Sequence, residues 1–361
     1  MKKICFFSGD ITRSGGTERV AIMIANELIK QKKYEICFLS LCEQKERMFF
    51  ELDNRIIRYK LGDRWIQPGP GYLPLIPKIR RFFKEQEIDI VIDIDIVLDI
   101  LSIPAAWRLK TKILSWEHSN CYYELSVLYR KLILKYSVRH SDFVVTLTEG
   151  DKKNYEQLLK RTKNIEAIYN PIGEIEGTQS KDKENRIITV GRLVSGKGMD
   201  YLTEVAAKVL PEHADWKWYV LGEGEERAFL ENFIAENKFE NRMILTGLVT
   251  NVGEYLNKSK IFVLTSKSEG LPMCLLEAKA YDLPCISFNI PTGPDEIIED
   301  GVNGFLIEPF DCEDMASKIN TLIEEEERLN AFTNNAKRNI DKFRMESIME
   351  KWNRVLDNLC V

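Results

Sequence analysis

The chain has 361 residues, of which 44% are hydrophobic and 30% are charged, and its formal net charge is −5. This composition is that of a globular protein, and the length exceeds one ordinary core, so we expect two domains of roughly 150–190 residues each. No apolar run approaches the ~20 residues that a membrane-spanning helix needs. The N-terminus, MKKICFFSGD, turns polar after four apolar residues, which predicts a first strand and not a signal peptide.

The eight cysteines contain no C-x-x-C pair, and several lie in apolar stretches. This pattern predicts reduced, buried thiols in a cytoplasmic protein. The charge is divided unevenly: residues 1–169 hold 29 Lys and Arg against 22 Asp and Glu, whereas the remainder holds 22 against 34. A basic half joined to an acidic half directs attention to an anionic partner of the basic half.

Apolar stretches of strand length recur through the first half, separated by helical or loop segments. Such alternation predicts a doubly wound parallel sheet, whose ligands bind at the carboxyl ends of the strands. The predicted strands are Ile4–Ser8, Glu35–Leu41, Ile56–Leu61, Asp89–Ile96, Lys112–Trp116, Phe143–Thr148 and Ile165–Tyr169.

The first strand is followed by a loop from Gly9 to Gly16, and Thr17 opens the helix that contains VAIMIANELIK. Gly15 and Gly16 precede this helix N-terminus, where a backbone without side chains can approach a phosphate or a sugar closely. A Gly-Gly turn by itself is weak support for a binding site, since any strand–helix connection can use one.

Asp93 and Asp95 have the D-x-D spacing of a metal motif, but they lie inside the alternating run IDIVIDIDIVLDI. Two carboxylates alone make a poor site for a hard cation, so we expect loop hydrogen bonds or a place in the lining of a ligand cleft. His118 follows the strand Lys112–Trp116 at the edge where ligands are expected. A lone histidine is usually structural, so a structural and a functional role both stay open, and Glu117 either orients His118 or caps the surface.

Two stretches of the first half combine cations with aromatic and aliphatic residues. Residues 75–84 read LIPKIRRFFK. Both stretches fit ordinary amphipathic helices packed on the sheet, and both also fit a face that rests on anionic lipid or holds a pyrophosphate group. The second stretch is a helical stripe with flanking cations, made of Leu125, Leu128, Tyr129, Leu132, Tyr136, Arg130, Lys131, Lys135 and Arg139.

The polar, glycine-containing segment after Asn170 marks a boundary between two halves of the chain. We predict an N-terminal domain over 1–170, a linker over 171–185, a second domain over 186–344 and a last amphipathic helix over 345–361. Strands of the second domain are predicted at Arg186–Val190, Trp218–Gly222, Met243–Gly247, Ile261–Thr265 and Cys285–Asn289, and Phe305–Glu308 follows a tight turn.

The loop after the strand Arg186–Val190 reads GRLVSGKG and contains Arg192 and Lys197. Two cations and free backbone N–H groups at one strand end suit a diphosphate, although either residue alone fits a solvated loop. The next strand ends in Gly222-Glu223-Gly224, which lacks the full dinucleotide fingerprint. We interpret it as a strand-end turn near a nucleotide and not as an NAD site, with Gly247 at the end of the following strand.

Residues 261–284, which read IFVLTSKSEGLPMCLLEAKAYDLP, are the stretch that indicates most about a ligand site. It predicts a buried strand, a polar loop ending at Glu269, a sharp turn at Gly270-Leu271-Pro272 and a helix from Met273 to Tyr281. Backbone N–H groups around the turn lack helical partners and suit an anion or a polyol. Glu269 and Glu277 flank them and can accept from sugar and ribose hydroxyls, although the E-x7-E spacing alone fits two solvated glutamates.

The strings S-x-S-E-G-L-P-x-x-x-L-E-A and V-G-R-L-x-x-x-K-G resemble the donor-site motifs of the retaining glycosyltransferases of family 4. The resemblance covers nearly the whole chain and is strongest from Asn185 to Glu308. It implies the α/β GT-B fold, in which two Rossmann-like, doubly wound parallel-sheet domains face a central cleft and the last helix packs on the first domain. It also implies transfer of a hexosyl or N-acetylhexosaminyl group from a nucleotide diphosphate sugar, here a UDP-sugar, to a saccharide, with retention of configuration, in surface polysaccharide or glycan assembly.

The resemblance assigns roles in the donor site. Arg192 and Lys197 clamp the diphosphate and stabilise the leaving group without a divalent metal or another cofactor. Glu277 holds the ribose, whereas the sugar is held by Glu269 and the amides near Gly270, Leu271 and Pro272. The remaining site residues lie beside the diphosphate and sugar (Gly15, Gly16), near the nucleotide (Gly222, Gly247) and beside the acceptor (His118).

The implied partners are the nucleotide sugar, a saccharide acceptor on a polyprenyl diphosphate, and the inner face of the plasma membrane, which the basic N-terminal half contacts. No nucleic acid partner is expected. Two alternatives stay open. One is another GT-B enzyme, such as a sugar-nucleotide epimerase or a phosphorylase, and the other is a non-catalytic protein that binds a sugar nucleotide within a glycan-assembly complex.

Overall fold

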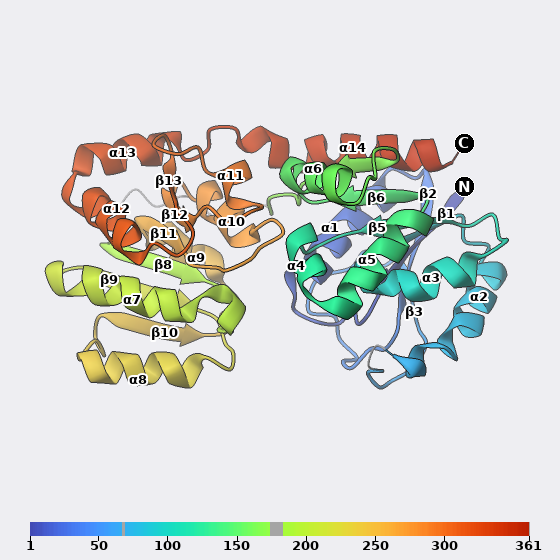
Figure 1. Ribbon diagram of the computed structural model, residues 1–361, viewed down its shortest axis with the longest axis horizontal. Helices are drawn as coiled ribbons and strands as arrows, with labels where there is room; N and C mark the ends of the chain where they lie inside the picture. Colours follow the sequence, from blue (N-terminus) through green and yellow to red (C-terminus); the bar gives the residue numbers. More distant parts are fainter. Residues whose placement is uncertain (67–68, 174–182, 361) are drawn as a thin grey trace. The chain divides into compact units, whose positions relative to one another are not determined.

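The computed structural model describes residues 1–66, 69–173 and 183–360. The chain forms two compact units: unit 1 is Met1–Pro171 with Phe343–Val361, and unit 2 is Ile172–Lys342. Each unit contains one parallel sheet, with seven strands in unit 1 and six in unit 2 (Figure 1). The predicted α/β class with two doubly wound sheets is confirmed. Residues 174–182 of the predicted linker lie outside the described residues.

The strand order of unit 1 is β3-β2-β1-β4-β5-β6-β7. The chain first builds outward from β1 on one side and then returns to build on the other, so right-handed crossovers place the connecting helices on opposite faces. The last five residues of β1 are buried, as expected of a parallel strand covered on both faces. The strands are β1 Lys2–Ser8, β2 Tyr34–Ser40, β3 Ile57–Lys60, β4 Ile90–Asp93, β5 Lys112–Trp116, β6 Phe143–Thr146 and β7 Ile165–Ala167.

Helices cover both faces of this sheet, and α2, α3 and α5 pack along one of them (Figure 1). The buried core under α2 and α3 contains Phe7 of β1, Phe83 of α2 and Leu101 of α3. The helices of unit 1 are α1 Gly16–Lys30, η1 Pro70–Tyr72, α2 Leu75–Glu85, η2 Ile96–Leu98, α3 Asp99–Ala106, α4 Cys121–Ser126, α5 Leu128–His140, α6 Glu149–Leu158 and α14 Met345–Leu359.

The C-terminal helix α14 packs within unit 1. Its apolar residues recur with the period of a helix, and Trp352 is fully buried with its ring centroid 4.7 Å from that of Trp116. Lys351 adds a hydrogen bond from Nζ to the carbonyl oxygen of Ala167, at 2.8 Å. The last segment of the chain therefore completes the core that the first 171 residues begin.

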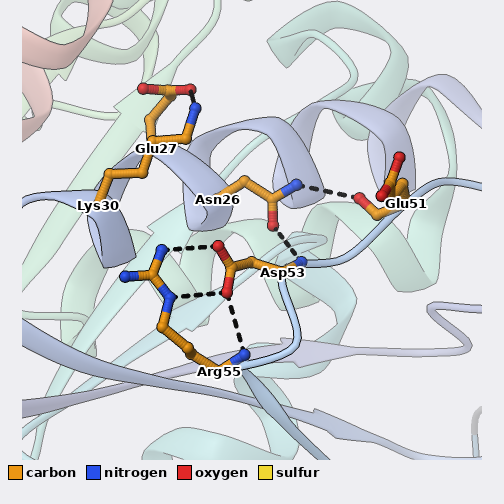
Figure 2. A network of polar contacts seen from close by, with 6 residues as sticks. All are labelled: Asn26, Glu27, Lys30, Glu51, Asp53 and Arg55. Carbon is orange, nitrogen blue, oxygen red and sulfur yellow. Dashed lines mark hydrogen bonds and ion pairs between the residues drawn. The ribbon is translucent and has the colours of Figure 1, made fainter.

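The long connection between β2 and β3 is tied to α1 by its backbone. The side chain of Asn26 donates to the carbonyl oxygen of Glu51 and accepts from the backbone N–H of Asp53, at 3.0 and 2.9 Å (Figure 2). Asp53 in turn binds the guanidinium of Arg55 through both carboxylate oxygens. One amide side chain thus fixes where the loop turns towards β3.

Unit 2 has the strand order β10-β9-β8-β11-β12-β13, which is again built outward from its first strand. Its core includes Leu202 of α7, Val263 of β11 and Ile319 of α12. The strands are β8 Arg186–Val190, β9 Lys217–Leu221, β10 Met243–Gly247, β11 Ile261–Leu264, β12 Cys285–Phe288 and β13 Gly304–Ile307. The helices are η3 Ser195–Lys197, α7 Met199–Val209, η4 Leu210–Glu212, α8 Arg227–Asn237, α9 Val252–Lys258, α10 Met273–Ala280, α11 Pro294–Ile297, α12 Cys312–Glu324 and α13 Glu326–Asn335, and η5 Ile340–Phe343 leads back to unit 1.

The strands lie where they were predicted, and the clearest difference is at the end of β4. It stops at Asp93 and not at Ile96, because the Asp95 carboxylate accepts the backbone N–H of Val97 at 2.9 Å and starts η2. Among the described residues, none of the helices combines the length and the hydropathy that a bilayer crossing requires.

Candidate active site

The loops that carry the predicted donor-site residues lie next to each other at the carboxyl edge of the unit 2 sheet. Residues 191–198 follow β8 and residues 265–272 follow β11, and these two strands are neighbours. The backbone N–H of Lys267 donates to the carbonyl oxygen of Gly196 at 3.0 Å, and the Thr265 hydroxyl donates to that of Lys197 at 3.2 Å. The strand order reverses here, so this is the position where doubly wound sheets bind ligands.

Gly198 makes the close approach of the two loops possible. Its φ is +67°, and a Cβ at this position would lie 2.0 Å from the carbonyl oxygen of Thr265. Any side chain would therefore both strain the backbone and separate the loops. The turn ends η3 and starts α7, which fixes Lys197 at the strand end.

Lys197 and Glu269 are 72 residues apart in the sequence and form an ion pair, with Nζ 2.5 Å from Oε1. The hydroxyl of Ser266 donates to the same oxygen at 2.7 Å. Burial disfavours the charged form of Lys197, but the Glu269 carboxylate outweighs this effect, so the pKa of the ammonium lies above its ordinary value. The site therefore holds a fixed positive charge beside a fixed carboxylate.

Arg192 supplies a second positive charge to the same strand end. Its side chain is exposed, and within the part of the chain that the structure describes its guanidinium has no hydrogen-bond or ion-pair partner. Its charge acts against the protonation of Lys197, which places the two cations close enough to interact. A ligand with two phosphate groups would meet both cations.

The turn at Gly270-Leu271-Pro272 is buried and leads directly into α10. Pro272 occupies the N-cap position without a side-chain hydrogen bond, so the first backbone N–H groups of α10 carry no side-chain cap. Cys274 follows in the first turn. Burial raises the pKa of its thiol strongly, and the charges of Lys197, Glu269 and Glu277 also act on it. The two predicted glutamates therefore belong to one neighbourhood.

Gly222 and Gly247 join the ends of β9 and β10 beside this site. The backbone N–H of Gly222 donates to the carbonyl oxygen of Gly247 at 3.0 Å. Gly222 has a φ of +139°, and a Cβ there would lie 1.8 Å from the carbonyl oxygen of Gly191. The turn after β9 consequently packs against the loop that carries Arg192.

The structure places Gly15, Gly16 and His118 on unit 1, whereas the other predicted site residues lie on unit 2. Gly15 is the N-cap of α1, where a Cβ would lie 2.2 Å from Oε2 of the nearly buried Glu18. Gly16 begins the helix and faces open space. At the α1 N-terminus, open space therefore lies beside Gly16, whereas the Glu18 carboxylate occupies the space beside Gly15.

His118 follows β5 and lies against Trp116, with ring centroids 4.3 Å apart. Burial lowers its pKa to about 3, so the imidazole is neutral near pH 7. Its Nε2 atom is buried and has no hydrogen-bond partner among the described residues. Glu117 does not orient this ring, because its carboxylate accepts from the Ser119 N–H at 2.7 Å and the Tyr155 hydroxyl at 3.4 Å.

The two aspartates of the D-x-D string are separated by the end of β4. Asp93 is fully buried and accepts from the hydroxyl of Ser102, and burial together with the neighbouring Asp99 raises its pKa well above the ordinary value. Asp95 instead caps η2 with a half-exposed side chain. The two carboxylates do not point to one common ligand position, so each has its own role.

The two basic stretches differ in what they expose. In α2 the aromatic residue Phe83 is buried, and the guanidinium of Arg80 is held by the carbonyl oxygens of Ala105 and Trp107. In α5, by contrast, Leu128 and Leu132 are 75% and 62% exposed, and Ile133, Leu134 and Val138 form the buried face. The predicted single helix is divided at Val127, so Leu125 lies on α4 and packs against the core. Of the predicted stripe, Leu128, Tyr129 and Leu132 of α5 are exposed.

Three residues that support the site were missed in the sequence. Thr292 donates its hydroxyl to the carbonyl oxygen of Glu269 at 2.7 Å, and Ser266 holds the carboxylate of the same residue. Lys279 of α10 is 1% exposed and donates to the carbonyl oxygen of Ile297 at 2.6 Å, and burial lowers its pKa to about 8. In the sequence, the lysine among apolar helix residues was the signal that could have pointed to Lys279 as a buried support.

Comparison with known proteins gives the family. Residues 173–339 match the model described as glycosyl transferases group 1, and residues 14–173 match that of glycosyltransferase family 4. An uncharacterized glycosyltransferase of Haemophilus influenzae is 33% identical over 357 residues, which cover 99% of this chain and 100% of that protein. A Campylobacter jejuni protein is 28% identical over 366 residues, covering 99% and 98%; it is the GalNAc-alpha-(1->4)-GalNAc-alpha-(1->3)-diNAcBac-PP-undecaprenol alpha-1,4-N-acetyl-D-galactosaminyltransferase.

Solved structures give the fold. HepE from Anabaena, in complex with UDP and glucose, has a TM-score of 0.80 at 18% identity and covers 98% of this chain and 99% of its own. The lipopolysaccharide outer core galactosyltransferase WaaB, in its apo form, has a TM-score of 0.78 at 22% identity and covers 99% of each chain. The two parallel sheets therefore form the GT-B fold, and the chain is a glycosyltransferase that belongs to the group 1 and family 4 glycosyl transferases.

Proposed function

We propose that the protein transfers a hexosyl or N-acetylhexosaminyl group from a UDP-sugar to a saccharide acceptor, with retention of configuration. The Lys197–Glu269 ion pair beside Arg192 carries this proposal, because it combines two cations with a sugar-binding carboxylate at the switch point of the unit 2 sheet. Arg192 and Lys197 would balance the charge that develops on the leaving diphosphate.

Each remaining group of the site has a role in this reaction. Glu269 would accept hydrogen bonds from the sugar hydroxyls, because Lys197 and Ser266 hold its carboxylate in place. Glu277 would bind the ribose, and the first backbone N–H groups of α10 would bind a phosphate oxygen. We do not assign Glu269 as a covalent nucleophile, since the departing phosphate can take the proton of the acceptor hydroxyl on the same face.

The glycine turns would shape the donor pocket, and His118 would bind the acceptor. Gly16 leaves open space at the N-terminus of α1, where the Glu18 carboxylate lies against Gly15, and Gly222 and Gly247 form the turn beside the Arg192 loop. His118 is neutral, and its Nε2 has no hydrogen-bond partner among the described residues, so this atom is left to donate or accept one according to the tautomer. Because two side-chain cations face the diphosphate, we expect turnover without a divalent metal.

The relatives support UDP as the nucleotide and a lipid-linked acceptor. HepE was solved with UDP and glucose, and the Campylobacter jejuni relative is named for an undecaprenol-linked oligosaccharide. Lipopolysaccharide 1,6-galactosyltransferase of Salmonella typhimurium is also similar, at 28% identity over 67% of this chain. An acceptor on a polyprenyl diphosphate would bring the protein to the cytoplasmic face of a membrane.

The surface of α5 suits that contact. The exposed Leu128 and Leu132 lie on the helix that also carries Lys131, Lys135 and Arg139, which match an anionic lipid surface. We expect sedimentation with phosphatidylglycerol vesicles and not with phosphatidylcholine vesicles, and loss of sedimentation when Leu128 and Leu132 are both replaced by Asn. Leu158→Asn on α6, where Leu158 is 49% exposed, is the matched control. Unchanged sedimentation of the double variant would refute the contact.

A thermal-shift panel of nucleotide sugars, with Mg²⁺ or with EDTA, tests the donor. A ligand that binds only the folded protein raises its melting temperature. We expect one UDP-sugar to stabilise the wild type in both buffers, and Glu277→Ala and Lys197→Ala to lose that shift. If no nucleotide diphosphate sugar shifts the wild type, the proposal is wrong. Donor binding without turnover across an acceptor panel would instead favour a non-catalytic partner of a glycan-assembly complex.

A further inference from the structure

The loop after β12, residues 289–293, turns one threonine inward. Because β11 and β12 are neighbouring strands, the loops that follow them lie at the same carboxyl edge of the unit 2 sheet. Asn289 and Pro291 of this loop are exposed, whereas Thr292 is only 2% exposed. Since buried polar groups in proteins are nearly always hydrogen-bonded, the partner of the Thr292 hydroxyl shows what the loop holds.

That partner belongs to the main chain of Glu269. The Thr292 hydroxyl donates to the Glu269 carbonyl oxygen at 2.7 Å. The carboxylate of Glu269 is held separately, by the ammonium of Lys197 and by the hydroxyl of Ser266, which donates to Oε1 at 2.7 Å. The loops after β8, β11 and β12 therefore meet at this one residue, and Thr292 secures its backbone.

The next residue, Gly293, packs directly on the turn that follows Glu269. A Cβ at Gly293 would lie 2.7 Å from Cδ of Pro272 and 2.9 Å from the carbonyl oxygen of Gly270. These distances leave no room for a side chain, so the loop touches the turn itself. The short helix α11 then begins at Pro294 and contacts α10 (Figure 1).

The far end of the same segment is fixed from inside α10. Nζ of Lys279, which is 1% exposed, donates to the carbonyl oxygen of Ile297 at 2.6 Å. Ile297 is the last residue of α11. The segment 289–297 is thus attached to Glu269 through Thr292 and to α10 through Lys279, so its position is coupled to both.

We propose that Thr292 is a positioning residue, which sets the place of the Glu269 carboxylate and with it the affinity of the site for the transferred sugar. This inference rests on the proposed function, since it concerns the sugar that Glu269 would bind. Thr292 is buried, so it acts through Glu269 and not by contact with a ligand. The UDP part of the donor would be held by Arg192, Lys197 and Glu277 and should depend little on Thr292.

Thr292→Val tests this role, because it keeps the shape of the side chain and removes the hydroxyl. Calorimetry compares free UDP with the UDP-sugars of glucose, galactose, N-acetylglucosamine and N-acetylgalactosamine. For the UDP-sugar that the wild type binds most tightly, we expect the affinity to fall by about tenfold, with the affinity for free UDP unchanged to within about twofold. Thr292→Ser keeps the hydroxyl and should retain the wild-type affinity for the UDP-sugar.

Thr111→Val is the matched control. Thr111 is 8% exposed in unit 1, and its hydroxyl donates to the carbonyl oxygen of Ile88 at 2.9 Å. Both valine variants lose one buried hydrogen bond from a threonine hydroxyl to a backbone carbonyl, so both should melt at a slightly lower temperature. Only Thr292→Val should lose affinity for the UDP-sugar.

Hydrogen exchange followed by mass spectrometry tests the same role without any ligand. We expect the amides of residues 266–271 to exchange faster in Thr292→Val than in the wild type, Thr292→Ser and Thr111→Val. The inference is overturned if this exchange is unchanged in Thr292→Val, if Thr292→Val binds the UDP-sugar like the wild type, or if it loses free UDP equally. A wild type that binds neither UDP nor any UDP-sugar would instead reject the proposed donor, and faster exchange in Thr292→Val would still support the hold of Thr292 on Glu269.

Discussion

Replacing Lys197 with methionine is the substitution that most directly probes the donor site. The change removes the ammonium that lies 2.5 Å from Glu269 and keeps a similar chain length. The two side chains are 24% and 11% exposed, so their surroundings are closer to protein than to water. At an effective dielectric constant of about 20, two opposite charges about 4 Å apart attract by about 4 kcal/mol. This value sets the upper limit for the transition-state stabilisation that is lost when the ammonium is removed.

The expected kinetic loss falls below that limit. Removing one fixed donor from a charge-stabilising site costs about 10²–10³ in kcat, or ~2.7–4 kcal/mol. We therefore predict that Lys197→Met lowers UDP release at saturating donor and acceptor by about 10²–10³, and that it weakens UDP affinity in calorimetry by about tenfold or more. The methionine cannot pair with Glu269, so the carboxylate would also repel the diphosphate.

Lys208→Met is the matched control for this experiment. Lys208 lies on α7 of the same unit and pairs with Glu313, and its side chain is 32% exposed. The substitution removes the same charge from the unit, so a general electrostatic effect would appear in both variants. Equal activity and equal UDP affinity of Lys197→Met and the wild type would refute the role of the ion pair. Equal losses in both variants would refute its specificity.

Three further predictions concern the turn at Gly222 and the two buried ionisable residues Lys279 and Asp93. Gly222→Ala should lower the melting temperature and abolish UDP binding in calorimetry, because its Cβ would lie 1.8 Å from the Gly191 carbonyl oxygen; normal binding would contradict this. The free energy of unfolding of the wild type, relative to that of Lys279→Met, should rise by about 3 kcal/mol between pH 8 and pH 10.5. The reason is that the folded pKa of about 8 lies below the ordinary 10.5, so the folded state binds fewer protons in this range. Denaturant titrations measure the difference between the two proteins, and a difference that does not change with pH would contradict the prediction. Asp93→Asn should stabilise the protein at pH 8 and have less effect at pH 4, because burial raises the folded pKa of this carboxyl and ionisation on unfolding then favours the unfolded state; melts at both pH values measure this.

The strands could be predicted from the sequence because buried parallel strands are short, continuous apolar runs. The residue at which each strand ends is set by local polar contacts, which an apolar run does not reveal. The run that contains Asp93 continues with the same alternation to Ile96, and only the hydrogen bond from the Val97 N–H to Asp95 shows where the strand stops. The two helices after β13 likewise meet at Glu325, where α12 ends and α13 begins.

The donor-site residues could be named from the motifs, but their contacts could not. Lys197 and Glu269 meet because β8 and β11 are neighbours, which is a property of the topology and not of the spacing. In α5 the period of the apolar residues allowed more than one buried face, and the structure buries Ile133 and exposes Leu132.

The configuration of the first sugar released by the protein tests the central claim most directly. Proton NMR can follow a UDP-sugar with an α-linkage in the absence of acceptor, when water slowly takes the place of the saccharide. We predict that the α-anomer of the free sugar appears first with UDP, in EDTA as well as in Mg²⁺, and that Lys197→Met suppresses the reaction. Release of the β-anomer first would contradict retention, and no UDP release from any nucleotide sugar, with or without acceptor, would contradict the proposed transfer itself.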